Sequence, residues 1–571
     1  MSRKIVVVGG VALGSKAACR AKRMDPKAEV YLVDKDEYIS YGGCGIPFYI
    51  SGDVSDVSEL RSTSFHMLRD ERFFLKDKGV VALTGTEAVS IDRKAKQVRI
   101  RRKDGTSDTL AYDKLVLATG TTPRQLPLPG RDLENVFTVA NLHDAMAIKQ
   151  KVTEGSVEKA VVVGAGFIGL EMAEALADMW EIDTTIVEVF DQIMPGFVSP
   201  GLAAMARTAI EKKGVKIYTS EKVEAIIGDG TVSAVKTDKR TLEADMVIMA
   251  VGVVPNTSLA KEAGLEVTPQ GWIKVNDRMQ TSDPDIYSGG DCAAVKNLVT
   301  GELGYFPLGS MANRQGRVIG TNVAGGEARF DGAVGSFVVK IFDNALAGAG
   351  LTAGKAVAAG FDAVGIQVAQ FDRAHFYPEK EIVFLELVVD RKTRRVIGIQ
   401  GFGGKDSGMV ARVNAVAPLL KYKPGVEEIS NLELAYSPPF ASAMDIINAL
   451  GNAASNYLDG RYRPMTMEEF RACWQDRSCG NTFFLDCRAN ADAQPFADRY
   501  PDLWKSIPHD QLRDRMNEVP KDKKLVLICN TGVRSYEAQL NLDDRGIIDN
   551  VSVGAGMAGL KAWGIDFDLD E

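Results

Sequence analysis

The sequence predicts a multidomain α/β protein, and three observations lead to that prediction. Residues 5–34 and 159–188 each combine a buried apolar strand, a glycine-rich turn, a helical stretch and a second strand that ends in an acidic residue. Longer strand patterns follow near residues 336–342 and 382–390. A length of 571 residues is enough for three or four domains. We therefore expect two Rossmann-like domains, an α+β domain and a last α/β domain.

The composition excludes some classes of protein. A net charge of −8 disfavours nucleic-acid binding, which needs a basic surface. No apolar run approaches the roughly 20 residues that span a bilayer, and the N-terminus enters a strand instead of a signal peptide. The seven cysteines are widely spaced and form no CxxC pair. We expect a cytoplasmic protein with reactive thiols, without a disulfide framework, a metal site or a membrane-inserted segment.

The first unit, residues 5–34, has the order expected of a dinucleotide site. A strand at 5–8 runs into a glycine turn and a helix that ends near Met24, and the next strand ends at Asp34, 20 residues after Gly14. The helix N-terminus would bind a pyrophosphate and the carboxylate a ribose, although Val11 replaces the usual second glycine. The candidate cofactor-binding residues here are Gly9, Gly10, Ala12, Gly14, Asp34 and Lys35.

The second unit, residues 159–188, carries the complete GxGxxG pattern at 164–169. Its second strand ends at Glu188, whose carboxylate would accept a hydrogen bond from a ribose 2′-hydroxyl and repel a 2′-phosphate. No Arg or Lys lies in residues 189–194, so we expect NADH to be preferred over NADPH. The candidate NADH-binding residues are Gly164, Gly166, Ile168, Gly169 and Glu188.

Two further strands, at 112–120 and 245–252, run into small-residue crossovers that include Thr119, Gly120 and Gly252. Residues 286–293 then contain a Gly-Asp pair ending at Asp291, for which the alternative role is a helix cap. With the two glycine units, this Gly-Asp pair makes residues 1–325 resemble the pyridine nucleotide–disulfide oxidoreductase family. The resemblance implies FAD at residues 1–115 plus 253–325, where Asp291 would meet the ribityl–phosphate region, and NADH at residues 116–252.

Residues 40–47 surround a single cysteine, Cys44, with glycine on both sides and a following proline. The alternative reading is a buried structural cysteine. Family members with CxxxxC carry two cysteines beside the flavin, but Cys44 has no such partner, so its second sulfur would come from the substrate. We expect the flavin's surroundings and helix ends to lower the pKa of this thiol.

Three single-cysteine branches of the family remain: NADH oxidase, NADH peroxidase and coenzyme A disulfide reductase. Oxidases and peroxidases of this type carry a histidine in the first glycine loop. This chain has Val11 and Ala12 there, and its first histidine is His66. The resemblance therefore argues against peroxide chemistry.

Residues 326–450 resemble the family's dimerisation domain. The segment 435–440 is similar to the YAPPF segment of coenzyme A disulfide reductases, in which a tyrosine, here Tyr436, reaches across a homodimer toward the partner's cysteine. A second family tyrosine aligns with Phe376, so Tyr377 is the candidate to replace it. Gly43 stands where the family commonly has Asn, and these departures leave room for a smaller persulfide or polysulfide substrate.

Coenzyme A binding needs cations for its phosphates. By resemblance, Arg23 and Ser40 match positions that touch coenzyme A, and Arg20, Lys22 and Arg61 are further candidates. For Arg20 and Lys22 the alternative is a solvated helix charge.

After a linker at 451–465, residues 466–571 form a last module of domain size. A strand at 525–528 leads into Cys529 and the sequence CxxGxR, which ends at Arg534 and precedes a helix. The module resembles a rhodanese, in which Cys529 would carry a persulfide stabilised by loop N–H groups and Arg534 would frame the loop. A phosphatase-like loop would need the arginine one residue later. Cys473, Cys479 and Cys487 match no motif, and we interpret them as structural.

The whole chain thus resembles coenzyme A disulfide reductase–rhodanese fusions, close to NADH-dependent persulfide reductases. This resemblance implies a homodimeric enzyme that uses NADH and FAD to reduce sulfane sulfur at Cys44, from a persulfide, a polysulfide or coenzyme A persulfide or disulfide. Coenzyme A would be a substrate or a bound ligand, and the rhodanese would transfer sulfur. Two alternatives stay open: an NADH oxidase or peroxidase that cycles through Cys44 sulfenic acid, and a non-enzymatic flavin redox sensor or sulfur carrier.

Overall fold

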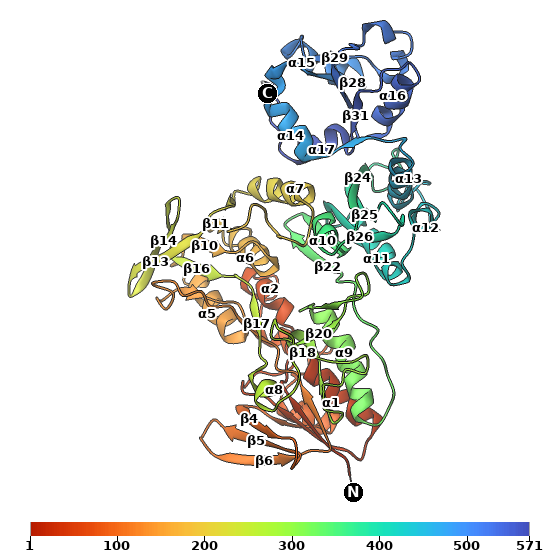
Figure 1. Ribbon diagram of the computed structural model, residues 1–571. Helices are drawn as coiled ribbons and strands as arrows, with labels where there is room; N and C mark the ends of the chain where they lie inside the picture. Colours follow the sequence, from red (N-terminus) through yellow and green to blue (C-terminus); the bar gives the residue numbers. More distant parts are fainter. Residues whose placement is uncertain (1, 570–571) are drawn as a thin grey trace. The chain divides into compact units, whose positions relative to one another are not determined.

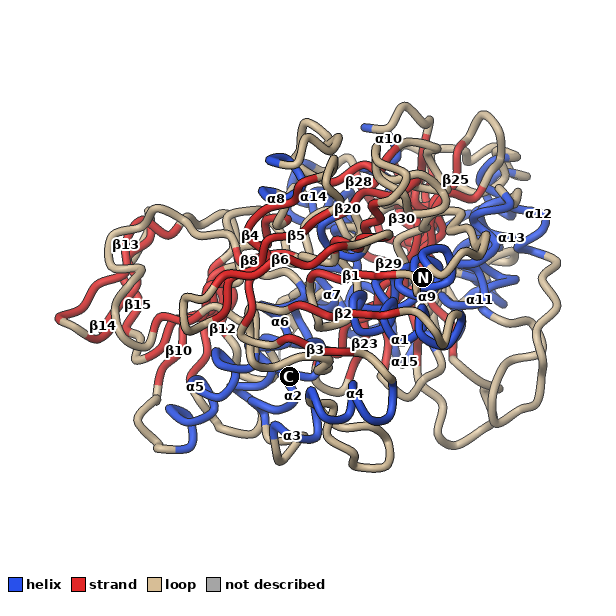
Figure 2. Tube along the Cα trace, turned by 90° about the horizontal axis from the view of Figure 1, so that it is seen from below, coloured by secondary structure: helices blue, strands red, loops and turns tan. Residues whose placement is uncertain are grey.

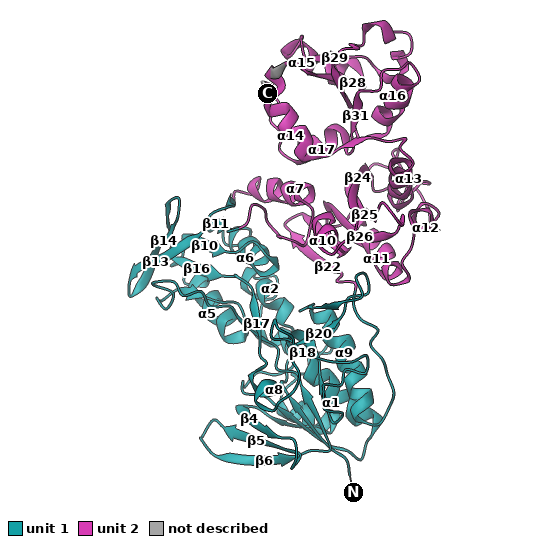
Figure 3. Cartoon of the chain, viewed as in Figure 1, with its two compact units in different colours: residues 1–189, 215–333 teal, residues 190–214, 334–571 magenta. Residues whose placement is uncertain are grey.

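The computed structural model describes residues 2–569, apart from the side chain of Cys479, and the chain forms two compact units (Figures 1 and 3). Unit 1 comprises residues 1–189 and 215–333, and unit 2 comprises residues 190–214 and 334–571. Within the described residues, no helix is both long enough and apolar enough to cross a membrane.

The first sheet of unit 1 is a five-stranded parallel sheet whose strands β1, β2 and β3 lie side by side (Figure 2). Its strands, in spatial order, are β19 (Ile286–Ser288), β7 (Lys114–Leu117), β1 (Lys4–Val8), β2 (Glu29–Val33) and β3 (Val81–Leu83). Helix α1 (Leu13–Met24) packs against α9 (Gly309–Val323), far along the chain (Figure 1). A Cβ at Gly316 or Gly320 would lie 2.7 Å from Leu13 O or 2.5 Å from Ala17 O, so only glycine permits this approach.

The second sheet of unit 1 is also parallel, which confirms the two strand–turn–helix–strand units predicted from the sequence. Its strands, in spatial order, are β12 (Lys216–Tyr218), β11 (Asp183–Val187), β10 (Lys159–Val163), β16 (Met246–Met249) and β9 (Val136–Phe137). Helix α6 (Phe167–Ala177) follows β10 and buries most of its apolar residues, and α5 (Leu142–Thr153) connects β9 to β10.

Smaller elements complete unit 1. Its short sheets contain β4 (Thr86–Asp92), β5 (Gln97–Arg102) and β6 (Ser107–Ala111); β13 (Val223–Asp229), β14 (Thr231–Thr237) and β15 (Thr241–Glu243); β8 (Thr121–Pro123) with β17 (Val253–Pro255); and β18 (Ile273–Lys274), β20 (Ala293–Lys296) and β21 (Leu303–Gly304). Its short helices are α2 (Ile46–Ser51), α3 (Val57–Leu60), α4 (Glu71–Lys78) and α8 (Ser258–Glu262).

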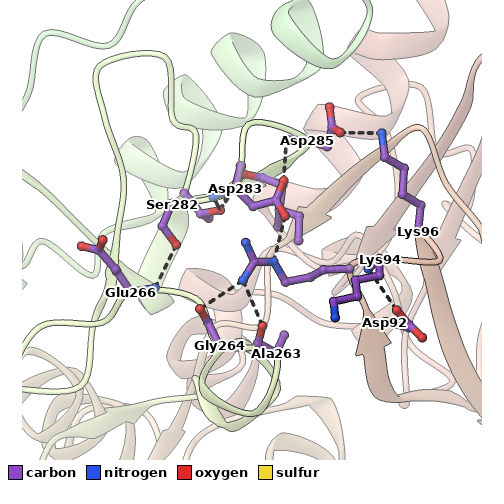
Figure 4. A network of polar contacts seen from close by, with 12 residues as sticks. Asp92, Lys94, Lys96, Ala263, Gly264, Glu266, Ser282, Asp283 and Asp285 are labelled. Atoms are coloured by element: carbon purple, nitrogen blue, oxygen red, sulfur yellow. Dashed lines mark hydrogen bonds and ion pairs between the residues drawn. The ribbon is translucent and has the colours of Figure 1, made fainter.

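A polar network joins the two sequence segments that were predicted to form one FAD-binding domain (Figure 4). Arg93, in the turn between β4 and β5, donates to Asp283 at 2.8 Å and to Gly264 O at 3.2 Å. Lys96 from the same turn pairs with Asp285 at 2.5 Å. Segments before residue 115 and after residue 253 are therefore held together by ion pairs as well as by the parallel sheet.

Unit 2 contains a five-stranded antiparallel sheet, and two of its strands match the strands predicted near 336–342 and 382–390. Its strands, in spatial order, are β22 (Phe337–Ile341), β23 (Asn344–Gly350), β26 (Val396–Gly404), β25 (Ile382–Asp390) and β24 (Ala363–Phe371). The accompanying helices are α10 (Ala353–Ala358), α11 (Met409–Val416), α12 (Val426–Ser430) and α13 (Ile446–Leu458). Since α13 runs to Leu458, the first half of the segment expected to be a linker is helical.

Residues 190–214, with helix α7 (Pro200–Glu211), pack onto this antiparallel sheet although they lie inside the segment assigned to NADH from the sequence. The Phe197 ring meets Phe337 edge-on at 5.8 Å, and the Ser199 N–H donates to Gln400 Oε1 at 2.7 Å. Both contacts are between residues distant in sequence, which local patterns do not predict.

The C-terminal part of unit 2 is a five-stranded parallel sheet with helices. Its strands, in spatial order, are β27 (Pro464–Met465), β31 (Asn550–Val553), β30 (Lys524–Ile528), β28 (Thr482–Asp486) and β29 (Trp504–Ser506). The helices are α14 (Met467–Gln475), α15 (Asn490–Arg499), α16 (Val533–Asp543) and α17 (Gly556–Ala562). The expected C-terminal α/β module is thus present.

Candidate functional site

The first glycine loop of unit 1 is shaped by close backbone contacts. Gly9 has φ 102°, and a Cβ there would lie 2.1 Å from Ala118 O; a Cβ at Gly14 would lie 1.7 Å from Gly9 O. The Gly10 N–H donates to Asp34 Oδ2 at 2.6 Å, and burial raises the pKa of the Asp34 carboxyl while this bond and Lys35 oppose the rise. The loop therefore has the compact shape that lets a backbone approach a pyrophosphate.

The second glycine loop repeats the same geometry. Gly164 has φ 103°, and a Cβ at Gly169 would lie 1.9 Å from Gly164 O. A Cβ at Gly166 would meet no atom within 4 Å, so the middle of this loop borders open space. Glu188 Oε2 accepts from the Ala165 N–H at 2.7 Å, and Ile168 lies in the first turn of α6. Both loops thus fit a dinucleotide by the same arrangement of glycine, helix and acid.

Asp291 lies at the end of the first sheet, in the turn Gly290–Cys292 that follows β19. Burial raises the pKa of its carboxyl to about 6. No hydrogen bond to this carboxylate occurs within residues 2–569, and it caps no helix there, so it fits a polar ligand group better than a cap. Gly120 and Gly252 have positive φ with open space beside them, and Thr119 Oγ1 donates to Asn256 O at 2.6 Å.

Cys44 lies in a short turn, Gly43–Gly45, immediately before α2, and the residue is exposed and forms no disulfide. The exposure contradicts the alternative of a buried structural cysteine. A Cβ at Gly309 would lie 3.4 Å from Cys44 Sγ, so the first residue of α9 lies against the sulfur. Because the N-terminus of a helix carries partial positive charge, α9 favours the thiolate form of Cys44. This contact was not predicted from the sequence.

The surroundings of Cys44 also oppose its ionisation. Desolvation by neighbouring atoms raises the pKa of the Cys44 thiol, and the negative charges of Glu171 and Asp291 raise it further. The expectation that the pKa of Cys44 is lowered is therefore wrong for the chain's own residues, because desolvation of the thiol, with the two acids, disfavours its charged form.

Glu171, on α6, was missed in the sequence analysis. Burial and the neighbouring Glu174 raise the pKa of its carboxyl to about 7. The charge of Glu171 acts on Cys44. The sequence feature that could have identified Glu171 is its acidic side chain within a mostly apolar helix, FIGLEMAEALA. A carboxyl with this pKa, whose charge acts on a reactive thiol, can hold or release a proton near neutral pH.

The predicted substrate-binding residues divide into two groups. Ser40 is buried, with φ 53°, and its N–H donates to Gly10 O at 2.9 Å, which ties the Cys44 segment to the first glycine loop. The Arg61 guanidinium lies 4.4 Å from the centre of the Tyr38 ring, and Arg23 is exposed.

Two other cations on α1 make structural contacts. Lys22 donates to Ala28 O at 2.6 Å, and Arg20 donates to Thr321 Oγ1 at 3.0 Å. These bonds favour the alternative that Arg20 and Lys22 are charges of the helix surface over a role in binding coenzyme A.

In unit 2, the structure brings the two candidate tyrosine segments together. The Ala374 N–H donates to Pro438 O at 3.2 Å, so the loops that carry Tyr377 and Tyr436 are adjacent. Tyr436 and Phe376 are exposed by 50% and 65%, and Phe440 by 78%. This face therefore presents aromatic side chains, as expected of a surface that meets a partner.

Cys529, also in unit 2, follows β30 and lies in a loop that directs hydrogen-bond donors at its sulfur. The Gly532 N–H donates to Cys529 Sγ at 3.0 Å and the Ser535 hydroxyl donates at 3.4 Å. Ser552 in turn donates to Ser535 Oγ at 2.8 Å. These donors stabilise negative charge on Cys529, as the CxxGxR pattern predicted, and Arg534 lies in the first turn of α16.

Comparisons with known proteins support this assembly. The family model described as pyridine nucleotide-disulphide oxidoreductase matches residues 3–316, and the model of its dimerisation domain matches residues 336–446. A solved NAD-dependent persulfide reductase from A. fulgidus is 37% identical, with a TM-score of 0.91, over 97% of this chain and 99% of its own.

Two relatives carry different names. An NAD(P)H coenzyme A polysulfide/persulfide reductase from Pyrococcus horikoshii is 32% identical over 452 residues, 78% of this chain and 97% of its own. An NADH oxidase from Methanocaldococcus jannaschii is 33% identical over 458 residues, 80% of this chain and 100% of its own.

Proposed function

Because the chain belongs to the pyridine nucleotide-disulphide oxidoreductase family and is therefore an oxidoreductase, we propose that it uses NADH and FAD to reduce sulfane sulfur at Cys44. The substrate would be a persulfide, a polysulfide, or coenzyme A persulfide or disulfide. The observation that carries the proposal is the exposed residue Cys44 between the Gly43–Gly45 turn and the start of α9, with no CxxxxC partner.

The proposed domains follow from the two glycine loops and the sheets. Residues 1–115 plus 253–325 would bind FAD through the first loop, Asp34 and Asp291, and residues 116–252 would bind NADH through the second loop and Glu188. FAD, when bound, would carry electrons from NADH to the sulfur on Cys44. The Glu188 carboxylate would repel a 2′-phosphate, which supports NADH over NADPH.

The chain's own residues would perform the sulfur chemistry. The Cys44 thiolate would attack the sulfane sulfur, and the N-terminus of α9 would stabilise its charge. Glu171, whose pKa of about 7 leaves it about half protonated at neutral pH, would in its protonated form give its proton to the departing sulfide or thiol. Ser40 would hold the Cys44 loop in place, and Arg23 and Arg61 would attract an anionic substrate.

Residues 326–450 would make a homodimer in which Tyr436, with Tyr377, meets the partner's active site. Their exposed, adjacent loops support this role. Residues 466–571 would form a rhodanese that accepts sulfur on Cys529. The parallel sheet, the donors on the sulfur, and the persulfide reductase structure that matches 97% of the chain support this part.

A second candidate is an NADH oxidase that cycles through Cys44 sulfenic acid, favoured by the similarity to the M. jannaschii NADH oxidase. Stopped-flow reoxidation of the NADH-reduced protein separates the two. Faster turnover with polysulfide than with oxygen or peroxide supports sulfur reduction, and the reverse order supports the oxidase. If the protein consumes NADH with none of these acceptors, the result would instead support a non-enzymatic flavin redox sensor or sulfur carrier.

A further inference from the structure

Cys487 and Cys529 each come directly after one of two neighbouring strands of the C-terminal sheet. Strands β28 and β30 pair in parallel, with Leu485 opposite Leu527, so the two cysteines follow at matching positions on the same face. The Cys487 N–H donates to Ile528 O at 2.8 Å, which continues the pairing one residue beyond β28. The register of the sheet therefore places these two side chains next to each other.

Their separation suits a disulfide. Neighbouring strands lie about 4.8 Å apart, and bridged cysteines have Cα atoms roughly 4.4–6.8 Å apart. Both side chains are buried, and neither is bridged. Burial raises the pKa of the Cys487 thiol far above its usual value, and the charge of Cys529 raises it further, so the two sulfurs interact electrostatically.

We propose that Cys487 is the resolving cysteine for a persulfide on Cys529, an inference that rests on the proposed sulfur-transfer role of Cys529. The Cys487 sulfur attacks the Cys529 Sγ, the bond between Sγ and the terminal sulfur breaks, and a Cys487–Cys529 disulfide forms. The proton of Cys487 leaves with the terminal sulfur as HS⁻. The sulfane sulfur gains two electrons, and the two cysteine sulfurs together lose two.

The cycle closes with an external reductant. Two equivalents of a low-molecular-weight thiol reduce the disulfide by thiol–disulfide exchange, and they leave as the oxidised disulfide. The C-terminal module thereby reduces sulfane sulfur to sulfide at the expense of thiols, without NADH or flavin. Because the thiolate is the attacking form and burial raises the pKa of Cys487, the negatively charged terminal sulfur of the Cys529 persulfide first takes the Cys487 proton and later leaves with it as HS⁻. Arg534 offsets part of the negative charge near Cys487.

The test uses the full chain in a Cys44→Ser background, without NADH or thiols, so that only the C-terminal module acts. The reduced protein is loaded with inorganic polysulfide and desalted, and then released sulfide and peptide masses are measured. The parent should release one sulfide per chain and show a Cys487–Cys529 bridge. When Cys487→Val is introduced into the Cys44→Ser protein, Cys529 should keep its persulfide, detected as a mass increase of about 32 Da. This variant should release sulfide at least about 10-fold more slowly than the parent. Cys473→Val, whose thiol contacts Thr482 Oγ1 at 3.5 Å, is the matched control and should behave as the parent.

The outcomes separate the two proposals. A persistent Cys529 persulfide without a bridge in the parent, a sulfur adduct on Cys487, or equal sulfide release from Cys487→Val would overturn the resolving role alone. If the parent, which retains Cys487, takes no sulfur on Cys529 and releases no sulfide, both the rhodanese proposal and this inference fail. The bridge is measured in a protein that retains Cys487, so the result does not depend on the folding of that variant.

Discussion

Replacing Gly309 with alanine should obstruct Cys44 while leaving the fold intact. The added methyl carbon would lie 3.4 Å from Cys44 Sγ, at the first residue of α9, and its backbone is not in the left-handed region. The attacking sulfur and the sulfur that it attacks must first come within about 3–3.5 Å of each other. The methyl group would therefore occupy part of the space through which the substrate reaches Cys44 Sγ. We expect a 10- to 100-fold loss in kcat/KM for polysulfide, roughly 1.4–2.7 kcal/mol of barrier.

The assay pairs turnover with chemical labelling. Alkylation of Cys44 by iodoacetamide and NADH-dependent polysulfide reduction should slow together in Gly309→Ala, while labelling of Cys529 stays at the parental rate. Gly42→Ala is the matched control, because its methyl group would meet only Leu60 O, at 3.8 Å. If Gly309→Ala reacts within twofold of the parent in both assays, the placement of α9 against the reactive sulfur is wrong.

Three further predictions concern unit 1. Since the pKa of Glu171 is about 7, its carboxyl loses its proton above that pH, so kcat/KM should fall on the alkaline side. Glu171→Gln should lower kcat/KM about 100-fold at pH 6 and remove the fall of kcat/KM at alkaline pH. An unchanged pH profile would refute the proton-donor role. Glu188→Ser should raise the NADPH-to-NADH ratio of kcat/KM about 10-fold, because the charge that repels a 2′-phosphate is removed; a constant ratio contradicts this. In Gly169→Ala the Cβ would lie 1.9 Å from Gly164 O, so the rate of NADH turnover should fall by more than about 100-fold while the flavin absorbance is retained. Loss of the flavin from this variant would contradict separate binding sites for NADH and FAD.

The glycine units could be predicted because their requirements are local. Gly9 and Gly14 follow a buried strand and open a helix, and the acid at Asp34 comes at a fixed spacing, so the sequence order alone indicates the structure. The loop of Cys529 was predictable for the same reason, since its donors Gly532 and Ser535 lie within six residues.

The missed features depend on contacts between distant segments. Gly309 reaches Cys44 only because α9 packs on α1, and Glu171 acts on the thiol from another domain-sized segment. The raised pKa of Cys44 was not predicted either, because its largest cause, desolvation, depends on how the chain packs around the thiol. Cys487 matched no motif, and its position next to Cys529 became visible only through the pairing of β28 with β30.

The proposed chemistry depends most directly on the sulfur of Cys44, and the decisive measurement is sulfide production from polysulfide by Cys44→Ser with NADH and without added thiols. We predict that NADH-linked sulfide release falls to background while flavin content and Cys529 labelling stay parental. Sulfide release at the parental rate from this variant would contradict the proposal that Cys44 carries the reaction.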